Sequence, residues 1–272
     1  MTQFRPHALT FTLLCTLLPS LHSQAQSSLM ITTPRVVVEG RERSASVHLK
    51  NAGDSTGSYR VFFREKSMTD NGTVKKIASD AQPAWSAATM IRFSPRRVTL
   101  APQQSQRVRL ALRKPANLAD GEYRSHLVFR SEPENLTRQS NTSQISTQFR
   151  PTFEFSIPVI IRHGRTFATA ALSDPALIQQ DKRQVLRLTL NRTGNRSLYG
   201  DFQVSGLQST TDSGTTLFEQ KGLALYPPLN EREVQLELPK NIPLQQYSHL
   251  KVVFQERPKY GGNERAELMF SP

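Results

Sequence analysis

The sequence predicts an all-β protein made of two β-sandwich domains in tandem. Most of the chain consists of short runs in which apolar and polar residues alternate, separated by clusters of Gly, Pro, Asn, Asp and Ser. Helical periodicity is almost absent. The pattern stops at His163-Gly164-Arg165 and restarts on a smaller scale beyond it. We therefore expect one domain over residues 26–163 and a second over residues 164–272.

The first 25 residues are expected to be a secretory signal peptide. Arg5 gives a positive start, residues 8–21 form an apolar run, and Ser23 and Ala25 are the small residues of a cleavage site. The run is too short to span a membrane. Cys15, the single cysteine, lies within it, so the exported chain would fold without disulfides. That favours two large, self-sufficient cores.

The first domain contains seven or eight candidate strands. A turn cluster at residues 51–54 and the hairpin signal Asp70-Asn71-Gly72 separate some of them. This number of short strands in about 135 residues suggests an immunoglobulin-like sandwich. The clearest alternating runs are residues 30–38, 45–49, 59–64, 98–100, 108–112, 123–129 and 145–161.

The second domain repeats the pattern over about 105 residues, with breakers at Pro227-Pro228 and Gly261-Gly262. We interpret it as another sandwich. Because the linker is short, the two domains should be held at a fixed angle with a cleft between them. The candidate strands are residues 167–172, 184–190, 200–204, 234–238, 250–254 and 266–270.

The run of residues 145–161 is the longest in the chain. Its odd positions are mostly apolar and most of its even positions polar, as in a strand with one apolar face. Fully extended, it would cover roughly 50 Å, two to three times the usual strand length. Pro151 and Pro158 favour an edge or a bulge. Two interpretations stay open: an ordinary core strand with a ragged start, or an exposed edge whose apolar row is meant for another protein.

Several classes of function are not predicted. The chain has 35 Lys and Arg against 22 Asp and Glu, but the arginines are scattered and no nucleic-acid motif accompanies them. The histidines have no metal-ligand spacing, and no cofactor fingerprint is present. Gly53-Asp54-Ser55-Thr56-Gly57 matches the G-x-S-x-G elbow of hydrolases, but it lies between two candidate strands with no helix after it. We therefore expect neither an enzyme, nor a metal or cofactor site, nor a nucleic-acid partner.

Four motifs carry a family resemblance. Residues 33–40 read TPRVVVEG, residues 120–127 read DGEYRSHL, residues 157–162 read IPVIIR, and residues 260–262 read YGG. Together with two tandem sandwiches behind a signal peptide, they resemble the periplasmic chaperones of the chaperone–usher pilus pathway. The long loop before the seventh strand and the lack of cysteine after the signal peptide are more similar to the archaic, non-classical branch.

The resemblance implies a stoichiometric assembly factor of the periplasm. Such a protein is a boomerang of two immunoglobulin-like domains that lends its seventh strand to pilus subunits lacking their last strand, and delivers them to an outer-membrane usher. The free protein would then have an apolar edge open to self-association. The implied donor-strand residues are Phe149, Pro151, Phe153, Phe155, Ile157 and Val159.

The resemblance also implies an anchor for the C-terminal carboxylate of the subunit. Arg35 occupies the first of the family's two basic positions, but Pro158 stands where the second has a lysine. Arg124, two residues from Glu122 on the same strand face, is the candidate replacement.

An interdomain charge network of Arg, Glu and Asp is implied as well. Arg162 and Glu122 match the first two members, whereas Lys259 occupies the third position. Glu256 and Glu264 are the acids that would compensate. The alternative function is a secreted β-sandwich adhesin or carbohydrate-binding protein, which would need an aromatic platform at its loop tips.

Overall fold

The computed structural model describes residues 28–78, 81–132, 151–181, 183–240 and 242–272. The expected signal peptide, Phe149 and the first part of the long alternating run lie outside these residues. The described part is almost entirely β-structure, with three single-turn 3₁₀ helices, and none of its helices is long and apolar enough to cross a membrane. The prediction of an all-β fold is therefore confirmed.

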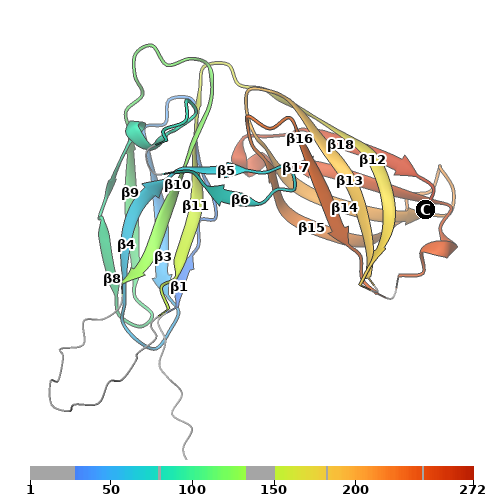
Figure 1. Ribbon diagram of the computed structural model, residues 1–272, viewed down its shortest axis with the longest axis horizontal. Helices are drawn as coiled ribbons and strands as arrows, with labels where there is room; N and C mark the ends of the chain where they lie inside the picture. The colour runs from blue at the N-terminus through green and yellow to red at the C-terminus, as the bar shows by residue number, and fades with distance from the viewer. Residues whose placement is uncertain (1–27, 79–80, 133–150, 182, 241) are drawn as a thin grey trace, which may run out of the picture.

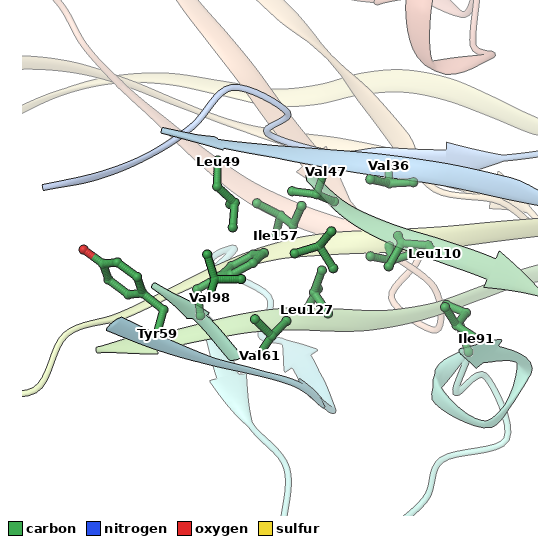
Figure 2. Close-up of a cluster of buried hydrophobic side chains, with 14 of the residues drawn as sticks. Val36, Val47, Leu49, Tyr59, Val61, Ile91, Val98, Leu110, Leu127 and Ile157 are labelled. Carbon is green, nitrogen blue, oxygen red and sulfur yellow. The ribbon is translucent and has the colours of Figure 1, made fainter. Parts of the chain in front are cut away.

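The N-terminal sandwich packs two sheets face to face around one core. Leu49 and Val47 from one sheet meet Ile157 and Leu127 from the other (Figure 2). One sheet has the order β1 (Leu29–Ile31), β3 (Ser44–Asn51), β9 (Ser105–Leu112), β7 (Ile91–Ser94). The other has the order β2 (Val36–Val38), β11 (Glu154–His163), β10 (Gly121–Glu132), β4 (Gly57–Arg64), β8 (Arg97–Leu100).

The C-terminal sandwich is built in the same way. Its core is rich in leucine and includes the rings of Phe202 and Phe254, whose centroids are 5.2 Å apart. The first sheet has the order β12 (Ala168–Gln180), β13 (Arg183–Gly194), β16 (Glu231–Glu237). The second has the order β15 (Thr215–Leu225), β14 (Leu198–Leu207), β17 (His249–Glu256), β18 (Arg265–Phe270). Strand β15 was not among the predicted strands.

The two sandwiches lie at an angle to each other (Figure 1). Among the described residues, the hydrogen-bonded ladders join strands up to β11 with one another and strands from β12 onward with one another. A small apolar cluster connects the two domains. It contains Ile160 of β11, Ala224 and Tyr226, with Val37, Met68 and Tyr199 packed against them.

A short hairpin leaves the N-terminal sandwich and crosses toward the C-terminal domain (Figure 1). It consists of β5 (Lys66–Met68) and β6 (Val74–Lys76), joined at the turn that the sequence indicates. Gly72 in this turn has φ +82°, a conformation that suits glycine. At the tip, the carbonyl of Asp70 accepts a hydrogen bond of 2.8 Å from the N–H of Glu233. The hairpin therefore bridges the domains.

Strand β11 is the C-terminal part of the long run. It pairs with β10 along its whole length, from Glu154 opposite Arg130 to His163 opposite Gly121. On its other side it pairs with β2 in parallel, and only over Val159–Ile161. In the described part of the chain, the residues from Glu154 to Pro158 therefore have no ladder on that side. Here the structure agrees with the edge-strand interpretation.

Two residues of the predicted donor row are buried in the free protein. Ile157 and Val159 are only 5% and 1% exposed, and both belong to the core of the N-terminal domain. They alternate with polar residues, but their apolar face is the face that this sandwich buries between its own sheets. Their side chains are therefore not part of an exposed row, although the edge backbone beside them stays open as far as Pro158.

Candidate functional site

Two exposed aromatic side chains lie at the start of β11, Phe153 directly before the strand and Phe155 within it. Phe153 is 46% exposed and Phe155 is 39% exposed, and they are among the few large apolar side chains of the described residues that reach this level. The N–H of Phe153 donates to Oγ of Ser131 at 2.8 Å, and its carbonyl accepts from the N–H of Ser131 at 2.9 Å. The backbone of β10 thus holds this segment extended. Pro151 precedes it, also exposed and outside the strand.

The opposite, polar face of the same strand is held by a cluster of charges around Glu154. Its carboxylate accepts from Arg64 at 2.5 Å and from Arg130 at 2.6 Å, and Lys76 of the hairpin lies 3.3 Å away. Burial raises the pKa of Glu154, but the hydrogen bonds from these three cations outweigh it and lower the pKa to about 2. Nearby, Lys66 donates to Oγ of Ser156 at 2.5 Å. The outer face of β11 is thus fixed to β4, β10 and the hairpin.

The stability of the protein should therefore depend on Glu154 in a pH-dependent way. The folded-state pKa of about 2 lies below the ordinary value of 4.5, so the ionised carboxylate stabilises the fold. This contribution is complete above pH 4.5 and is lost as the pH falls toward 2. We expect Glu154→Gln to lower the free energy of unfolding at pH 7, and the difference from wild type to shrink between pH 4.5 and 2. Urea titrations at a series of pH values would measure it, and a difference independent of pH would contradict the assignment.

The second part of the site is a pocket of about 380 Å³ between the two domains. Arg35, directly before β2, is only 4% exposed and lines this pocket together with Pro158. One of its Nη atoms donates to the hydroxyl of Tyr226 at 2.6 Å, and its guanidinium lies 3.7 Å from the ring centre of Tyr199. Among the residues that the structure describes, Nε and Nη1 of Arg35 have no hydrogen-bond partner. A buried cation with free donors is suited to hold an anionic group.

Arg124 also lies against the Tyr226 ring, 3.9 Å from its centre, and 4.8 Å from the ring centre of Trp85. Its Nη1 donates to the carbonyl of Pro227 at 3.5 Å. Burial lowers the pKa of Arg124, and the neighbouring Arg35 lowers it further, against the raising effects of Tyr226 and the acids nearby. The two predicted anchor residues are therefore brought together around one tyrosine. Arg124, however, is not among the residues lining the pocket.

The charge network joins the two domains at their other contact. Nε of Arg162 lies 3.4 Å from Glu122, and the same carboxylate accepts from the N–H and the hydroxyl of Ser197 at 3.0 and 2.8 Å. Nη1 of Arg162 donates to the carbonyls of Tyr260 and Gly261 at 2.9 and 3.1 Å. Glu122 and Arg162 each therefore bind atoms of the C-terminal domain.

The third member of this network is neither of the acids considered from the sequence. Glu39, before the first turn, lies 3.2 Å from Nη1 of Arg162. Glu256 instead forms a two-point pair with Arg196 at 2.8 and 3.0 Å inside its own domain. Lys259 packs on the ring of Tyr260, 5.8 Å from its centre. From the C-terminal domain, Arg162 is bound by the carbonyls of Tyr260 and Gly261, and the acid that completes the network is Glu39 of the N-terminal domain.

Sequence reasoning missed the aromatic residues that position the arginines. Tyr199 and Tyr226 lie more than 160 residues from Arg35 in the chain and match no motif. In the described residues, no group of three or more His, Cys, Asp or Glu could hold a metal ion. Ser55 lies in the bend between β3 and β4, as expected, and no helix follows it.

Comparisons with known proteins complete the description. No protein-family model matches the sequence, and a search of curated proteins found no match. The structure is similar to solved fimbrial chaperones. The match to the class 5 fimbriae chaperone CfaA covers 90% of this chain and 100% of the CfaA chain, with 12% identity and a TM-score of 0.47. The E. coli chaperone DraB covers 89% and 96%, with 15% identity and a TM-score of 0.46.

A third similar structure is a complex, the CsuC–CsuE chaperone–tip adhesion subunit pre-assembly complex from archaic chaperone–usher Csu pili of Acinetobacter baumannii. It covers 89% of this chain and 97% of its own, with 12% identity and a TM-score of 0.43. Each of the three matches extends over about nine-tenths of the chain.

Proposed function

We propose that the protein is a periplasmic chaperone of the chaperone–usher type, which binds pilus or fimbrial subunits and delivers them to an outer-membrane usher. One observation carries the proposal: among the described residues, β11 has no ladder on one side from Glu154 to Pro158, and the exposed Phe153, directly before the strand, and Phe155, within it, lie at that place. An extended chain of a subunit would pair with this edge by main-chain hydrogen bonds. The two aromatic side chains would enter the groove of the subunit.

The magnitudes support such a complex. Burying a phenylalanine side chain that was exposed contributes about 1.5–3 kcal/mol, so the pair would contribute about 3–6 kcal/mol before the costs of association. Main-chain hydrogen bonds along the open edge add to this and prevent aggregation through the same edge. The ion pairs around Glu154 hold the strand in its extended form, which lowers the ordering cost.

The pocket supports the same function. In this proposal Arg35 holds the C-terminal carboxylate of the subunit, and the distance from Arg35 to the open edge fixes the register of the added strand. Arg35 is prepared for this by Tyr226 and Tyr199, which hold its guanidinium without neutralising it. The junction of Glu122 and Arg162 keeps the domain angle, and with it the shape of the pocket.

The test is to co-express the chain with the secreted β-proteins encoded beside it and to isolate the complex. We expect one subunit per chaperone. In hydrogen exchange, the amides of residues 154–157 that do not donate to β10 should become protected on binding, while those of β13 in the C-terminal domain should not change.

Two results would contradict the proposal. One is an edge already fully protected in the free monomer and unchanged by partners. The other is binding to a glycan panel without capture of any subunit, which would favour the adhesin or carbohydrate-binding alternative.

A further inference from the structure

The interdomain pocket contains more positive charge than one arginine supplies. Arg35 from the N-terminal domain and Lys221 and Arg232 from the C-terminal domain all line it. No Asp or Glu of the described residues is part of its lining. The remaining wall is largely apolar and includes Met68 and Val74 of the bridging hairpin. A pocket with three cations and no acid in its wall is suited to an anionic group.

Arg232 of β16 is held in place by main-chain atoms. Its Nη1 donates to the carbonyl of Ala224 at 2.5 Å, while its buried Nε has no hydrogen-bond partner in the described part of the chain. In the described residues it forms no ion pair. Its guanidinium packs on Gly72 so closely that a Cβ added there would lie 2.1 Å from Cζ of Arg232. Burial lowers the pKa of Arg232, and Tyr226 opposes this.

Arg124 shares several of these features, since it too donates to a main-chain carbonyl and its buried Nε has no hydrogen-bond partner among the described residues. It differs in position, because its guanidinium lies 4.8 Å from the ring centre of Trp85 and 3.9 Å from that of Tyr226 and is not part of the pocket lining. Because Arg124 does not line the pocket, it is not placed to bind a group held there, whereas Arg35 and Arg232 both are. The geometry therefore separates the two arginines into a structural residue, Arg124, and a pocket residue, Arg232.

We propose that Arg232 is the second cation of the carboxylate anchor, supplied by the C-terminal domain where Pro158 leaves the N-terminal strand without one. This inference rests on the proposed function, since it identifies a further residue of the same site. Arg35 and Arg232 line the pocket from different domains, so a bound carboxylate would link the domains through the pocket. The hairpin covers this site because its Gly72 lies against Arg232 and its Asp70 binds Glu233.

The test uses the isolated full chain with a small probe. N-acetylalanine presents the carboxylate of a chain end, and N-acetylalaninamide is its neutral counterpart. NMR detects the Nε–H resonances of the arginines directly. We expect N-acetylalanine, but not the amide, to shift the resonances of Arg35 and Arg232.

Substituted chains provide a second test, in which the affinity for N-acetylalanine is measured. Arg232→Gln and Arg35→Gln should each weaken binding of N-acetylalanine about tenfold, as expected for the loss of one charge-assisted hydrogen-bond donor. Arg232→Lys should restore part of the affinity, because it keeps the charge but not the fork. The matched control is Arg187→Gln, an exposed arginine on the neighbouring strand β13 and outside the pocket.

The outcomes separate this inference from the proposed function. If Arg35→Gln weakens binding and Arg232→Gln leaves it within about twofold, Arg232 is not the second cation. If N-acetylalanine leaves the Arg232 resonance of the wild-type chain unshifted, the inference is also wrong. This measurement uses the wild-type chain alone, so it does not depend on whether a variant folds. In both cases the wild-type chain would still capture a subunit at the β11 edge. If the wild-type chain captures no subunit, it is the proposed function that is rejected.

Discussion

Replacing Phe153 and Phe155 together with aspartate is expected to abolish capture of a subunit while leaving the protein folded. Both side chains are largely exposed in the free chain, so two carboxylates there cost the fold little. In a complex, the same positions would lose about 3–6 kcal/mol of apolar burial and would bring two unpaired charges into the groove of the subunit. Co-purification measures capture, and thermal unfolding measures the fold.

Two controls make this result interpretable. Met30→Asp changes another exposed apolar side chain, on β1, and should leave capture unchanged. Val159→Asp places a charge in the core of the N-terminal domain, so it should unfold that domain. Unfolding by the Phe153 and Phe155 substitutions would show that these rings serve the fold. Normal capture by the folded double variant would assign the function to another surface.

Glu122→Ala is expected to destabilise the junction between the domains by about 3–5 kcal/mol, the usual cost of removing one partner of a buried ion pair. The carboxylate of Glu122 is buried, contacts Arg162 and accepts two hydrogen bonds from Ser197. Without it, Arg162 keeps the partly exposed Glu39 and two carbonyls, and the N–H of Ser197 loses its acceptor. Urea unfolding would measure the loss, and small-angle scattering would detect a change in the domain angle.

Glu132→Ala is the matched control. Glu132 lies on the same strand but pairs with the exposed Arg60 and Arg97, so its loss should cost only about 0–1 kcal/mol. If the two substitutions have equal effects, the contact between Glu122 and Ser197 does not hold the domains together.

The sequence predicted the fold well because the fold depends on local patterns. Alternation of apolar and polar residues marks strands, and turn residues mark their ends, so both sandwiches and the hairpin turn at Gly72 could be predicted. Strand β15 could not, because it is interrupted by two register shifts against β14 and by Gly222 at φ +75°. The alternation there is broken, and only pairing with β14 makes the segment a strand.

The site could be predicted only in part, for two physical reasons. Alternation shows that Phe153 and Ile157 share one face of a strand but not which part of that face the domain itself covers. The partners of Arg35 and Arg162 come from another domain, so no spacing in the sequence points to Tyr226 or Gly261. Arg124 was selected because it shares a strand face with Glu122, but its contacts with the rings of Trp85, from a loop, and Tyr226, from the other domain, follow from no spacing in the sequence.

The cluster between the domains has a consequence for how the chain reaches its final form. Ile160 is fully buried, but its neighbours Ala224 and Tyr226 lie some 60 residues further along the chain. Synthesis proceeds from the N-terminus, and domains generally fold as units in that order. The first sandwich is thus folded before the second domain exists. At that stage the guanidiniums of Arg35 and Arg124 and the tip of the hairpin are exposed to solvent on the side that the second domain will cover. The last event of maturation is then a docking step, in which tyrosines of the late domain close over arginines of the early one.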